Sequence, residues 1–331
     1  MAFKKVFVSL VVIWFLFSCN QNVTELSGKD GKLKVVNWNV QTFFDAVTTG
    51  DEYTEFIRSN RWGKDAYVER LERLCQVIKV LDADIFVMEE IENEQVVHDI
   101  SNFLAGQWDE SKVYSHACFA REEGSSIGCA VLSRVPLCAM SVHSMDVRDG
   151  EQKMPKMRPL MQLKATVRNR ELVLMVNHWK SKSGGEEETE VWRNREEGIL
   201  AELVSKAVEQ DKAVLVLGDF NRDINDFCLT RKGDVVLRYW EDGRLSDDGV
   251  VVTSPWFLDE RKMVQPGSYY YNEEWSRIDN MFAAGNAEIL DFYPAVEGEW
   301  CDGGTCVPKR YLIWDGTGYS DHLPIVCLVR F

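Results

Sequence analysis

The sequence predicts one α/β domain, arranged as a sandwich of β-sheets and helices. Strand-like and helix-like segments alternate along the chain, and strands dominate residues 113–178. This mixture is typical of layered α/β proteins. A length of 331 residues would allow about two domains of roughly 150 residues each, but no change in composition and no internal repeat separates them. We therefore interpret residues 32–331 as a single domain.

Apolar periodicity predicts three helices. The second begins after Asn93, a residue type that caps helices, and runs to Leu104. The third begins in the acidic stretch 186–190, which suits the start of a helix, and ends near Val208. The first covers Tyr67–Leu81, with an apolar face made of Val68, Leu71, Leu74, Ile78 and Leu81.

Short apolar or alternating runs predict the strands around these helices. In chain order, the expected strands are Leu33–Val40, Asp84–Glu89, Val113–Phe119, Cys129–Ser133, Leu160–Val167, Leu172–Asn177, Ala213–Leu217, Arg277–Phe282 and Ile325–Arg330.

The first residues predict export. Lys4 and Lys5 precede the apolar run Val6–Phe17, which is shorter than the roughly 20 residues that span a bilayer and suits a signal peptide. The run ends in Ser18-Cys19, which resembles the bacterial lipobox. We expect a signal peptide over residues 1–18, lipidation of Cys19 and a flexible tether over residues 19–31. The alternative is an ordinary signal peptide with an incidental cysteine. The lipidated protein would be anchored on the periplasmic or outer side of a bacterial membrane.

The charge excludes one class of nucleic-acid binder. The formal net charge is −15, and it becomes −17 once Lys4 and Lys5 leave with the predicted signal peptide. A basic patch that neutralises many phosphates is therefore not expected. A phosphate-bearing substrate has to be reached with metal ions or a few local cations.

The cysteines do not form a dense disulfide framework. Cys118, Cys129 and Cys327 lie in apolar, strand-like surroundings and are interpreted as buried. Cys301 and Cys306 flank a four-residue loop. They could form a disulfide in an oxidising compartment or remain two free thiols.

Oxygen-bearing side chains follow two of the expected strands. Glu90 closes an apolar strand, where a carboxylate at the rim of a sheet can hold a hard cation. Taken alone, an acid among Glu89, Glu92 and Glu94 is more often simply solvated. Asn39 ends the first strand and could support a metal-bound water, or it could cap a turn.

Two further strands end in polar groups that suit phosphate chemistry. His178 can donate to a phosphate oxygen or transfer a proton near neutral pH, and Lys180 and Lys182 add positive charge beside it. Asp219 and Asn221 follow the strand that ends at Gly218, and strand alternation places them on the same side. Together they could orient a water and bind a phosphoryl oxygen, although such turns are also common without a function.

The last two segments carry an acid and an imidazole that could pair. Alternation places Arg277 and Asp279 on one face of the next strand. A buried Asp279 needs a partner, and His322 could supply it, since a carboxylate fixes the tautomer of a functional imidazole. Asp321 would then face a metal or the other side of the site.

Taken in order, these segments resemble the endonuclease/exonuclease/phosphatase superfamily. The resemblance covers nearly all of the chain after Cys19 and includes a start typical of secreted bacterial members. One departure is Glu89, where the family often has Gln; the apolar strand before it aligns Glu90 with the family's Glu. The shared motifs are the strand-end Asn39, Glu90 after its apolar strand, Asn177-His178-x-Lys180-Ser181-Lys182, Gly218-Asp219-Phe220-Asn221, Arg277-Ile278-Asp279 and Ser320-Asp321-His322-x-Pro324.

The resemblance implies a four-layer fold, in which two mixed β-sheets pack face to face with helices outside, and a site at one end of the sandwich. Glu90 would be the main ligand of Mg²⁺ or Mn²⁺, with Asn39 and Asp321. The remaining roles implied are water and phosphate positioning by Asp219 and Asn221, base or transition-state stabilisation by His322 held by Asp279, phosphate binding or leaving-group protonation by His178, and substrate binding by Lys180, Lys182 and Arg277.

The expected function is hydrolysis of phosphodiester bonds by a monomer, most simply as a nuclease acting on DNA or RNA with low sequence preference. Two alternatives remain open on the same fold. One is a sphingomyelinase-like or phosphoinositide phosphatase-like enzyme. The other is a non-catalytic binding lipoprotein, which the filled set of motif positions disfavours.

Overall fold

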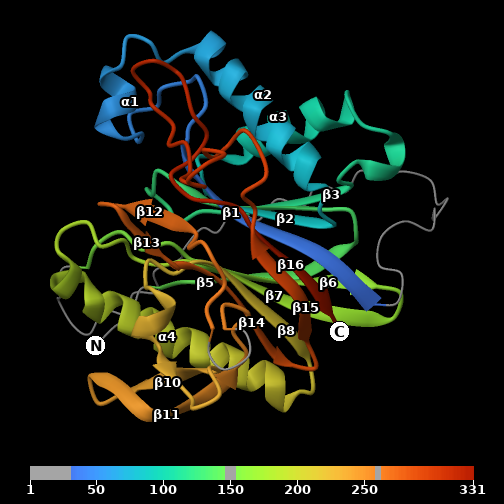
Figure 1. Ribbon diagram of the computed structural model, residues 1–331, viewed down its shortest axis with the longest axis vertical. Helices are drawn as coiled ribbons and strands as arrows, with labels where there is room; N and C mark the ends of the chain where they lie inside the picture. Colours follow the sequence, from blue (N-terminus) through green and yellow to red (C-terminus); the bar gives the residue numbers. More distant parts are fainter. Residues whose placement is uncertain (1–30, 146–153, 258–261) are drawn as a thin grey trace, which may run out of the picture.

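Two β-sheets pack face to face, with helices on both outer sides (Figure 1). The computed structural model describes residues 31–145, 154–257 and 262–331. This four-layer arrangement confirms the predicted fold class. The predicted signal peptide, Cys19 and nearly all of the predicted tether lie outside the described residues.

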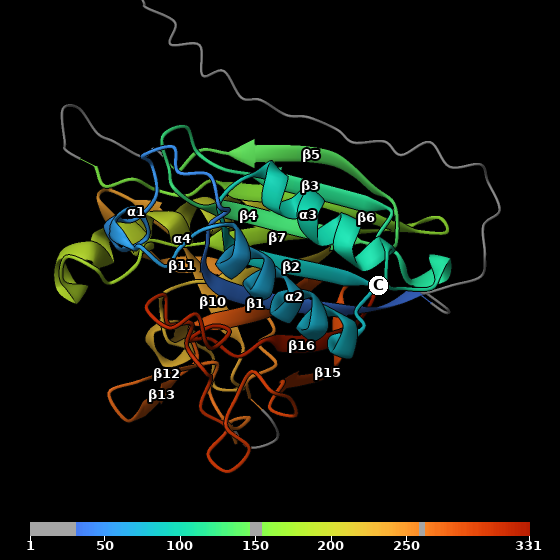
Figure 2. The ribbon, with the colours of Figure 1, turned by 90° about the horizontal axis from the view of Figure 1, so that it is seen from above.

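The first sheet contains, in spatial order, β15 (Glu288–Pro294), β16 (Ile325–Arg330), β1 (Lys32–Phe43), β2 (Ile85–Ile91), β4 (Gly128–Ser133) and β3 (His116–Ala120). β1 is parallel to β2 and antiparallel to β16. The short helix α1 (Thr54–Arg58) and the longer helices α2 (Lys64–Leu81) and α3 (Glu94–Ala105) follow β1 and β2, and α2 and α3 cover the outer face of this sheet (Figures 1 and 2).

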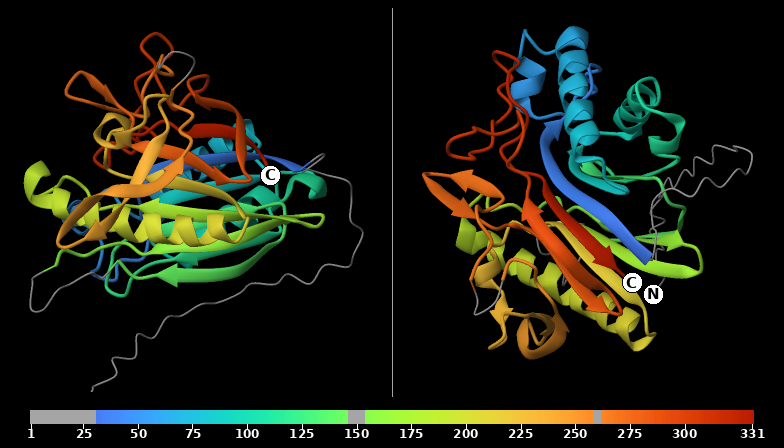
Figure 3. Two further views of the ribbon diagram at one scale, coloured as in Figure 1. Left: turned by 90° about the horizontal axis from the view of Figure 1, so that it is seen from below. Right: turned by 45° about the vertical axis from the view of Figure 1, so that its right-hand side comes forward.

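The second sheet contains, in spatial order, β14 (Asp279–Gly285), β8 (Ala213–Asp219), β7 (Arg170–His178), β6 (Leu160–Val167) and β5 (Leu137–His143). Helix α4 (Glu186–Glu209) covers its outer face. A small three-stranded sheet made of β9 (Cys228–Leu229), β10 (Val235–Glu241) and β11 (Arg244–Val252) packs on α4 (Figure 3). The hairpin of β12 (Tyr269–Tyr271) and β13 (Glu274–Ser276) extends from one end of the sandwich, and two 3₁₀ turns occupy Glu110–Lys112 and Ile224–Asp226.

β1 is buried on both faces because it lies between two apolar cores. Leu33 and Val35 enter the core between the two sheets, whereas Trp38 and Val40 enter the core beneath α2 and α3. Strand alternation therefore directs Asn39 toward the second sheet.

The helix predictions are confirmed, with one error in α2. All three helices lie where periodicity placed them, and Asn93 caps α3 by accepting a hydrogen bond from the Val96 N–H at 3.1 Å. Val68, however, is 38% exposed, and the buried stripe passes instead through Tyr67 and Arg70. The prediction was wrong because it counted only apolar residues and could not see that an arginine occupies the buried face.

The strand predictions are confirmed in position, and several bounds differ by a few residues. β16 has the predicted bounds, whereas β3 begins at His116 after a 3₁₀ turn and β14 begins at Asp279 rather than Arg277. The strands β5, β9, β10, β11, β12, β13 and β15 were not predicted, because they carry mixed exposed and buried residues at sheet edges or outside the sandwich.

Cys118, Cys129 and Cys327 are buried as predicted, and Cys301 and Cys306 are both free thiols in the structure.

Within the described ranges, no helix has both the length and the apolar character required to cross a membrane.

Candidate functional site

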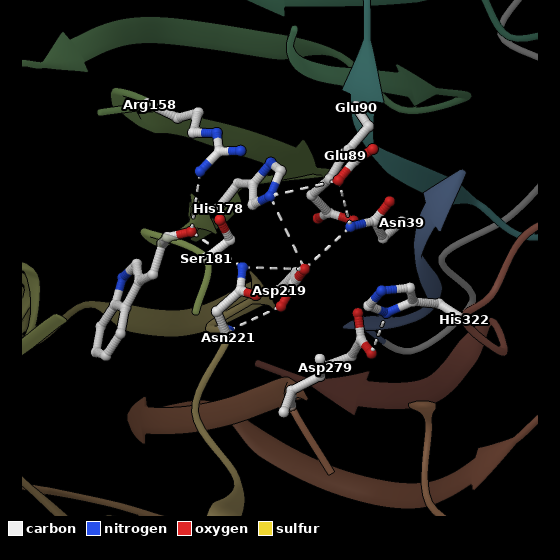
Figure 4. A network of polar contacts seen from close by, with 12 residues as sticks. Asn39, Glu89, Glu90, Arg158, His178, Ser181, Asp219, Asn221, Asp279 and His322 are labelled. Carbon is white, nitrogen blue, oxygen red and sulfur yellow. Dashed lines mark hydrogen bonds and ion pairs between the residues drawn. The ribbon is translucent and has the colours of Figure 1, made fainter. Parts of the chain in front are cut away.

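Acids, amides and histidines from the six sequence segments meet at one end of the sandwich (Figure 4). The parallel strands β1 and β2 end there, as do the parallel strands β7 and β8. β14 runs antiparallel to β8 and begins there, and His322 lies just before β16. The topology therefore gathers the residues at the ends of four strands and the beginnings of two.

Asn39 links the carboxylates of the two sheets. Its side-chain nitrogen donates to Asp219 Oδ2 at 3.0 Å and to Glu90 Oε1 at 3.3 Å. Its oxygen accepts from the Gln41 N–H at 3.0 Å. In this arrangement Asn39 positions two acids, and its role as a metal ligand stays a prediction.

Glu90 reaches the site through a break in strand regularity. Phe86 and Met88 face the core beneath the helices, so simple alternation would send Glu90 in that direction too. Its φ of 67° and the irregular pairing between Glu89 and Ile91 turn it back. The facing bulge in β1 brings the Thr42 N–H to Glu90 Oε2 at 2.5 Å.

Asp219 and Asn221 lie together, but through a turn and not through strand alternation. β8 ends at Asp219, and Asn221 has a left-handed φ of 47°. The Asn221 N–H donates to Asp219 Oδ1 at 2.8 Å, and its side-chain nitrogen donates to the Trp179 carbonyl at 3.0 Å. Gly218 is required just before them, because a Cβ there would collide with the Asn177 carbonyl and its φ is 139°.

The predicted pair of Asp279 and His322 is present. His322 Nδ1 and Asp279 Oδ2 are 2.8 Å apart, and both side chains are buried. Burial alone would lower the pKa of His322, but the charge and hydrogen bond of Asp279, together with Asp219, raise that pKa well above its usual value. Ser320 fixes the loop by donating to the Asn39 carbonyl at 2.6 Å and accepting from the His322 N–H at 3.1 Å.

His178 faces the same two acids as Asn39. Its Nε2 is 3.8 Å from both Glu90 Oε1 and Asp219 Oδ2. Burial lowers the pKa of His178 well below its usual value, and the nearby charges of Arg158 and His322 lower it further. Burial thus favours the neutral form of His178, whereas Asp279 favours the cationic form of His322.

The acids of the site suit a divalent cation. Burial raises the pKa of Asp219 to about 7, with a further contribution from Asp279. The Asp279 Oδ1 and Glu89 Oε1 oxygens are buried without a hydrogen-bond partner. Such an oxygen-rich group, short of positive charge, is the donor set that Mg²⁺ and Mn²⁺ prefer. Asp321 lies at its margin, with Oδ1 3.9 Å from His322 Nε2.

The three predicted substrate-binding cations do not join this group. Lys180 Nζ bonds to the carbonyls of Ser181 and Ser183, and Lys182 pairs with Glu186. Each ammonium is thus engaged within its own loop or with the start of α4.

Arg277 corrects a specific expectation. Because it precedes β14, it does not share a strand face with Asp279. Its guanidinium donates to the Val264 carbonyl at 3.1 Å and lies over Trp256 at 5.6 Å, while its backbone N–H donates to Asp223. Arg277 therefore stabilises the surrounding loops.

Arg158 and Arg70 escaped the sequence analysis, and Glu89 was noted there only as a departure from the family pattern. Arg158 lies beside His178 and donates to the Trp179 carbonyl at 3.4 Å (Figure 4). Buried Glu89 lies beside Asn37, with 3.3 Å between Oε2 and Nδ2. Arg70 supports the β1 bulge from α2. The sequence signal for Arg70 was an arginine at i, i+4 spacing to Leu74 on the apolar face; Arg158 carried no such signal.

Comparisons with known proteins agree with this geometry. A family model described as Endonuclease/Exonuclease/phosphatase family matches residues 34–290. The match stops before the loop of Ser320 to His322, whose place in the site comes from the structure. A comparison with curated proteins gives no match.

Among solved structures, truncated TDP2 from Caenorhabditis elegans has a TM-score of 0.57 at 13% identity, covering 93% of this chain and 100% of that chain. TDP2 from D. rerio, complexed with a single-strand DNA product, has a TM-score of 0.56 at 16% identity, covering 91% and 100%. An endonuclease/exonuclease/phosphatase family protein from Bacteroides thetaiotaomicron has a TM-score of 0.53 at 14% identity, covering 91% and 98%. At these identities the likeness shows the fold alone.

Proposed function

Since the chain belongs to the endonuclease/exonuclease/phosphatase family, we propose that it is a metal-dependent phosphodiesterase that cleaves nucleic acid with little sequence preference. The observation that carries this proposal is the convergence of Glu90, Asp219 and the Asp279–His322 pair at one end of the sandwich. Family members are generally hydrolases of phosphate esters, and this group has the acids and imidazoles that such a reaction needs.

The two histidines have different roles because their surroundings favour different charges. Cationic His322, held through Nδ1 by Asp279, presents Nε2 to a phosphoryl oxygen and stabilises the negative charge that develops there. Neutral His178 faces the acids through Nε2 and can hydrogen-bond to another substrate oxygen.

Asp219 is the residue best suited to accept the proton of the attacking water. Burial raises the pKa of this carboxyl, so it accepts a proton more readily than an ordinary aspartate. The Asn221 N–H fixes one of its oxygens and Asn39 fixes the other, so the carboxylate cannot rotate freely. Asn221 thereby helps to place the water in line with the scissile bond.

Glu90 would hold the divalent cation, with Asp321 at the margin of the same group. Such an ion, when bound, adds positive charge against the phosphoryl oxygens and promotes ionisation of a bound water.

One comparison favours nucleic acid as the substrate class, and the charge of the chain indicates how it would be bound. One structural relative, TDP2 from D. rerio, was solved with a single-strand DNA product. The net charge of −15 then implies few phosphate contacts and a shallow dependence of binding on salt. Contacts made mainly to the backbone carry little sequence information, hence the low sequence preference.

A substrate panel tests this function. Single-stranded and double-stranded DNA, RNA, sphingomyelin vesicles and phosphoinositide vesicles are incubated with the full chain in Mg²⁺, Mn²⁺ or EDTA. We expect hydrolysis of nucleic acid in either metal and none in EDTA, and His322→Ala should remove the same activity. Rapid lipid turnover with intact nucleic acid would replace the nuclease with a lipid-directed enzyme. Tight binding without turnover of any substrate would indicate a non-catalytic protein.

A further inference from the structure

The hairpin of β12 and β13 places aromatic rings directly beside His322. Tyr269 forms an antiparallel bridge with His322, and the adjacent Leu323 N–H donates to the Ser268 carbonyl at 2.7 Å. The ring centroids of Tyr269 and His322 are 4.7 Å apart. A substrate phosphate held by His322 is therefore within about one nucleotide of this hairpin, since successive nucleotides of a strand are separated by only a few ångströms.

Two tyrosines on one face of the hairpin present parallel rings. Tyr269 and Tyr271 are two residues apart on β12, so they share a face. Their ring centroids are 6.3 Å apart and their planes differ by 18°. Tyr270 points away and packs against Trp275, with centroids 5.0 Å apart. Tyr271 is 59% exposed, which is unusual for a large aromatic residue and leaves much of its ring free for a ligand.

We infer that Tyr271, backed by Tyr269, is a stacking platform for the nucleobase next to the scissile phosphate. The inference rests on the proposed nuclease function and names the part of the substrate that this surface takes. Aromatic rings stack on any base, because every base has a π face, and such stacking adds affinity without requiring a particular sequence.

The charge distribution gives this platform a purpose. The ammonium groups of Lys180 and Lys182 and the guanidinium of Arg277 bond to groups of the surrounding loops or of α4, so they are directed away from the acids of the site. An acidic protein gains little affinity from a polyanionic backbone. Stacking on an uncharged base provides affinity that does not depend on the charge of the protein.

The residues at the tip of the hairpin favour a base over a lipid surface. Asn272 and Glu273 form the exposed turn, and Glu274, the first residue of β13, is exposed and pairs across the hairpin with Tyr271. A hairpin that inserts into a membrane leads with apolar or aromatic residues, and anionic lipids repel carboxylates. Here Glu273 lies at the tip, and Tyr269 on the aromatic face contacts the ring of His322.

Two matched oligonucleotides test the platform in the full chain with Mg²⁺. One is a short oligothymidylate, and the other has the same backbone with every base replaced by a stable abasic residue. We expect the wild type to cleave the oligothymidylate with a lower KM than the abasic oligonucleotide. Tyr271→Ala should raise the KM for oligothymidylate by roughly 5- to 100-fold, the range for losing one base–aromatic stack. The KM values of this variant for the two oligonucleotides should therefore lie closer together than those of the wild type. Tyr271→Phe keeps the ring and should keep the preference.

Trp314→Ala is the matched control, because Trp314 is a 63% exposed aromatic in a turn beside α2. It should leave the preference unchanged. If the wild type cleaves both oligonucleotides with equal KM, or if Tyr271→Ala preserves the preference, the platform is refuted while the proposed nuclease stands. If neither oligonucleotide is cleaved, the proposed function itself fails. If Tyr271→Ala instead removes binding to phosphatidylcholine–sphingomyelin vesicles, the hairpin is a lipid contact.

Discussion

At the scale of single residues, the site separates two imidazoles by their surroundings. Asp279 lies 2.8 Å from His322 and raises the pKa of that imidazole, whereas burial and the charges of Arg158 and His322 lower the pKa of His178, whose nearest acids are 3.8 Å away. A cationic and a neutral histidine in one site can bind and orient different oxygens of one phosphoryl group.

The Asp279–His322 pair leads to the first prediction. His322→Ala and Asp279→Ala should each lower kcat by roughly 10²- to 10⁴-fold, the range for a positioned acid–base or charge-stabilising group. The double variant should lose little more than the worse single variant, because the two residues act as a unit. Single-turnover rates of all three variants measure this. Losses that multiply would show that the residues act independently.

Glu196 leads to a prediction about stability. It is buried in α4, where its Oε2 accepts the Lys180 N–H at 2.9 Å and its Oε1 has no partner. Burial raises the pKa of Glu196 from 4.5 to about 8. Between pH 4.5 and about pH 8, Glu196 has lost its proton in the unfolded chain but retains it in the folded chain. The free energy of unfolding therefore falls as pH rises through this range.

Glu196→Gln removes that titration and keeps the hydrogen-bond acceptor. The Tm measured from pH 5 to pH 8 should therefore fall less steeply with rising pH in this variant than in the wild type. Glu187→Gln, an acid at the start of the same helix, is the control and should follow the wild type. Parallel curves for Glu196→Gln and the wild type would contradict the assignment.

At the scale of elements, helix α2 supports the Glu90 side of the site through Arg70. The buried guanidinium donates to the carbonyls of Val40, Gln41 and Thr42, and it lies 3.7 Å from the centre of the Tyr311 ring. These carbonyls belong to the bulge of β1 whose Thr42 N–H holds Glu90. Arg70 is thus a positioning residue for the carboxylate that would hold the cation.

Arg70→Met should raise the Mg²⁺ concentration for half-maximal activity by about 10- to 100-fold, the range for losing a supporting contact of a metal ligand. Arg70→Lys should show a smaller shift, since lysine keeps the charge but not the planar fork of donors. Mg²⁺ titrations of activity, with thermal unfolding measured alongside, separate the two roles. A lower Tm with an unchanged Mg²⁺ requirement would mean that Arg70 serves stability alone.

The elements also explain how far the sequence could lead. Apolar periodicity located α2, α3, α4 and most strands of the sandwich but missed the short α1, and the motifs named the polar groups at strand ends. The sequence could not reveal that Glu90 and Asn221 adopt left-handed backbone angles, because the angle of Glu90 depends on the facing bulge and that of Asn221 on the Trp179 carbonyl. Nor could it show where long cationic side chains point, which is why Arg277 was misplaced and Arg70 missed.

At the scale of the whole molecule, the residues that stabilise the sandwich and the residues of the candidate site lie in different places. The apolar cores lie within the layers, while the acids and histidines collect at one end, where strands of both sheets meet. Four carboxylates gather at this end in a protein that is already acidic; they are Glu89, Glu90, Asp219 and Asp279. A bound cation would offset that local charge.

The location of the whole molecule gives a further prediction, which rests on the sequence alone. Cys19→Ala should move the protein from the membrane fraction to the soluble exported fraction, or leave it held by an uncleaved signal peptide. One acyl chain gives only marginal membrane binding, and stable anchoring needs a second signal. Fractionation and mass spectrometry of the N-terminal peptide measure this. An unmodified, soluble wild-type chain would contradict lipidation.

The central claim is that Glu90 anchors a divalent cation that drives phosphodiester hydrolysis. Its most direct test is the Mg²⁺-dependent cleavage rate of a single-stranded oligonucleotide by Glu90→Gln, with Glu94→Gln as the matched control four residues away on α3. We predict a loss of roughly 100-fold or more in Glu90→Gln, because metal catalysis supplies several kcal/mol, with Glu94→Gln at the wild-type rate and EDTA abolishing activity in both. A folded Glu90→Gln variant that cleaves at the wild-type rate, in Mg²⁺ and in EDTA alike, would contradict the claim.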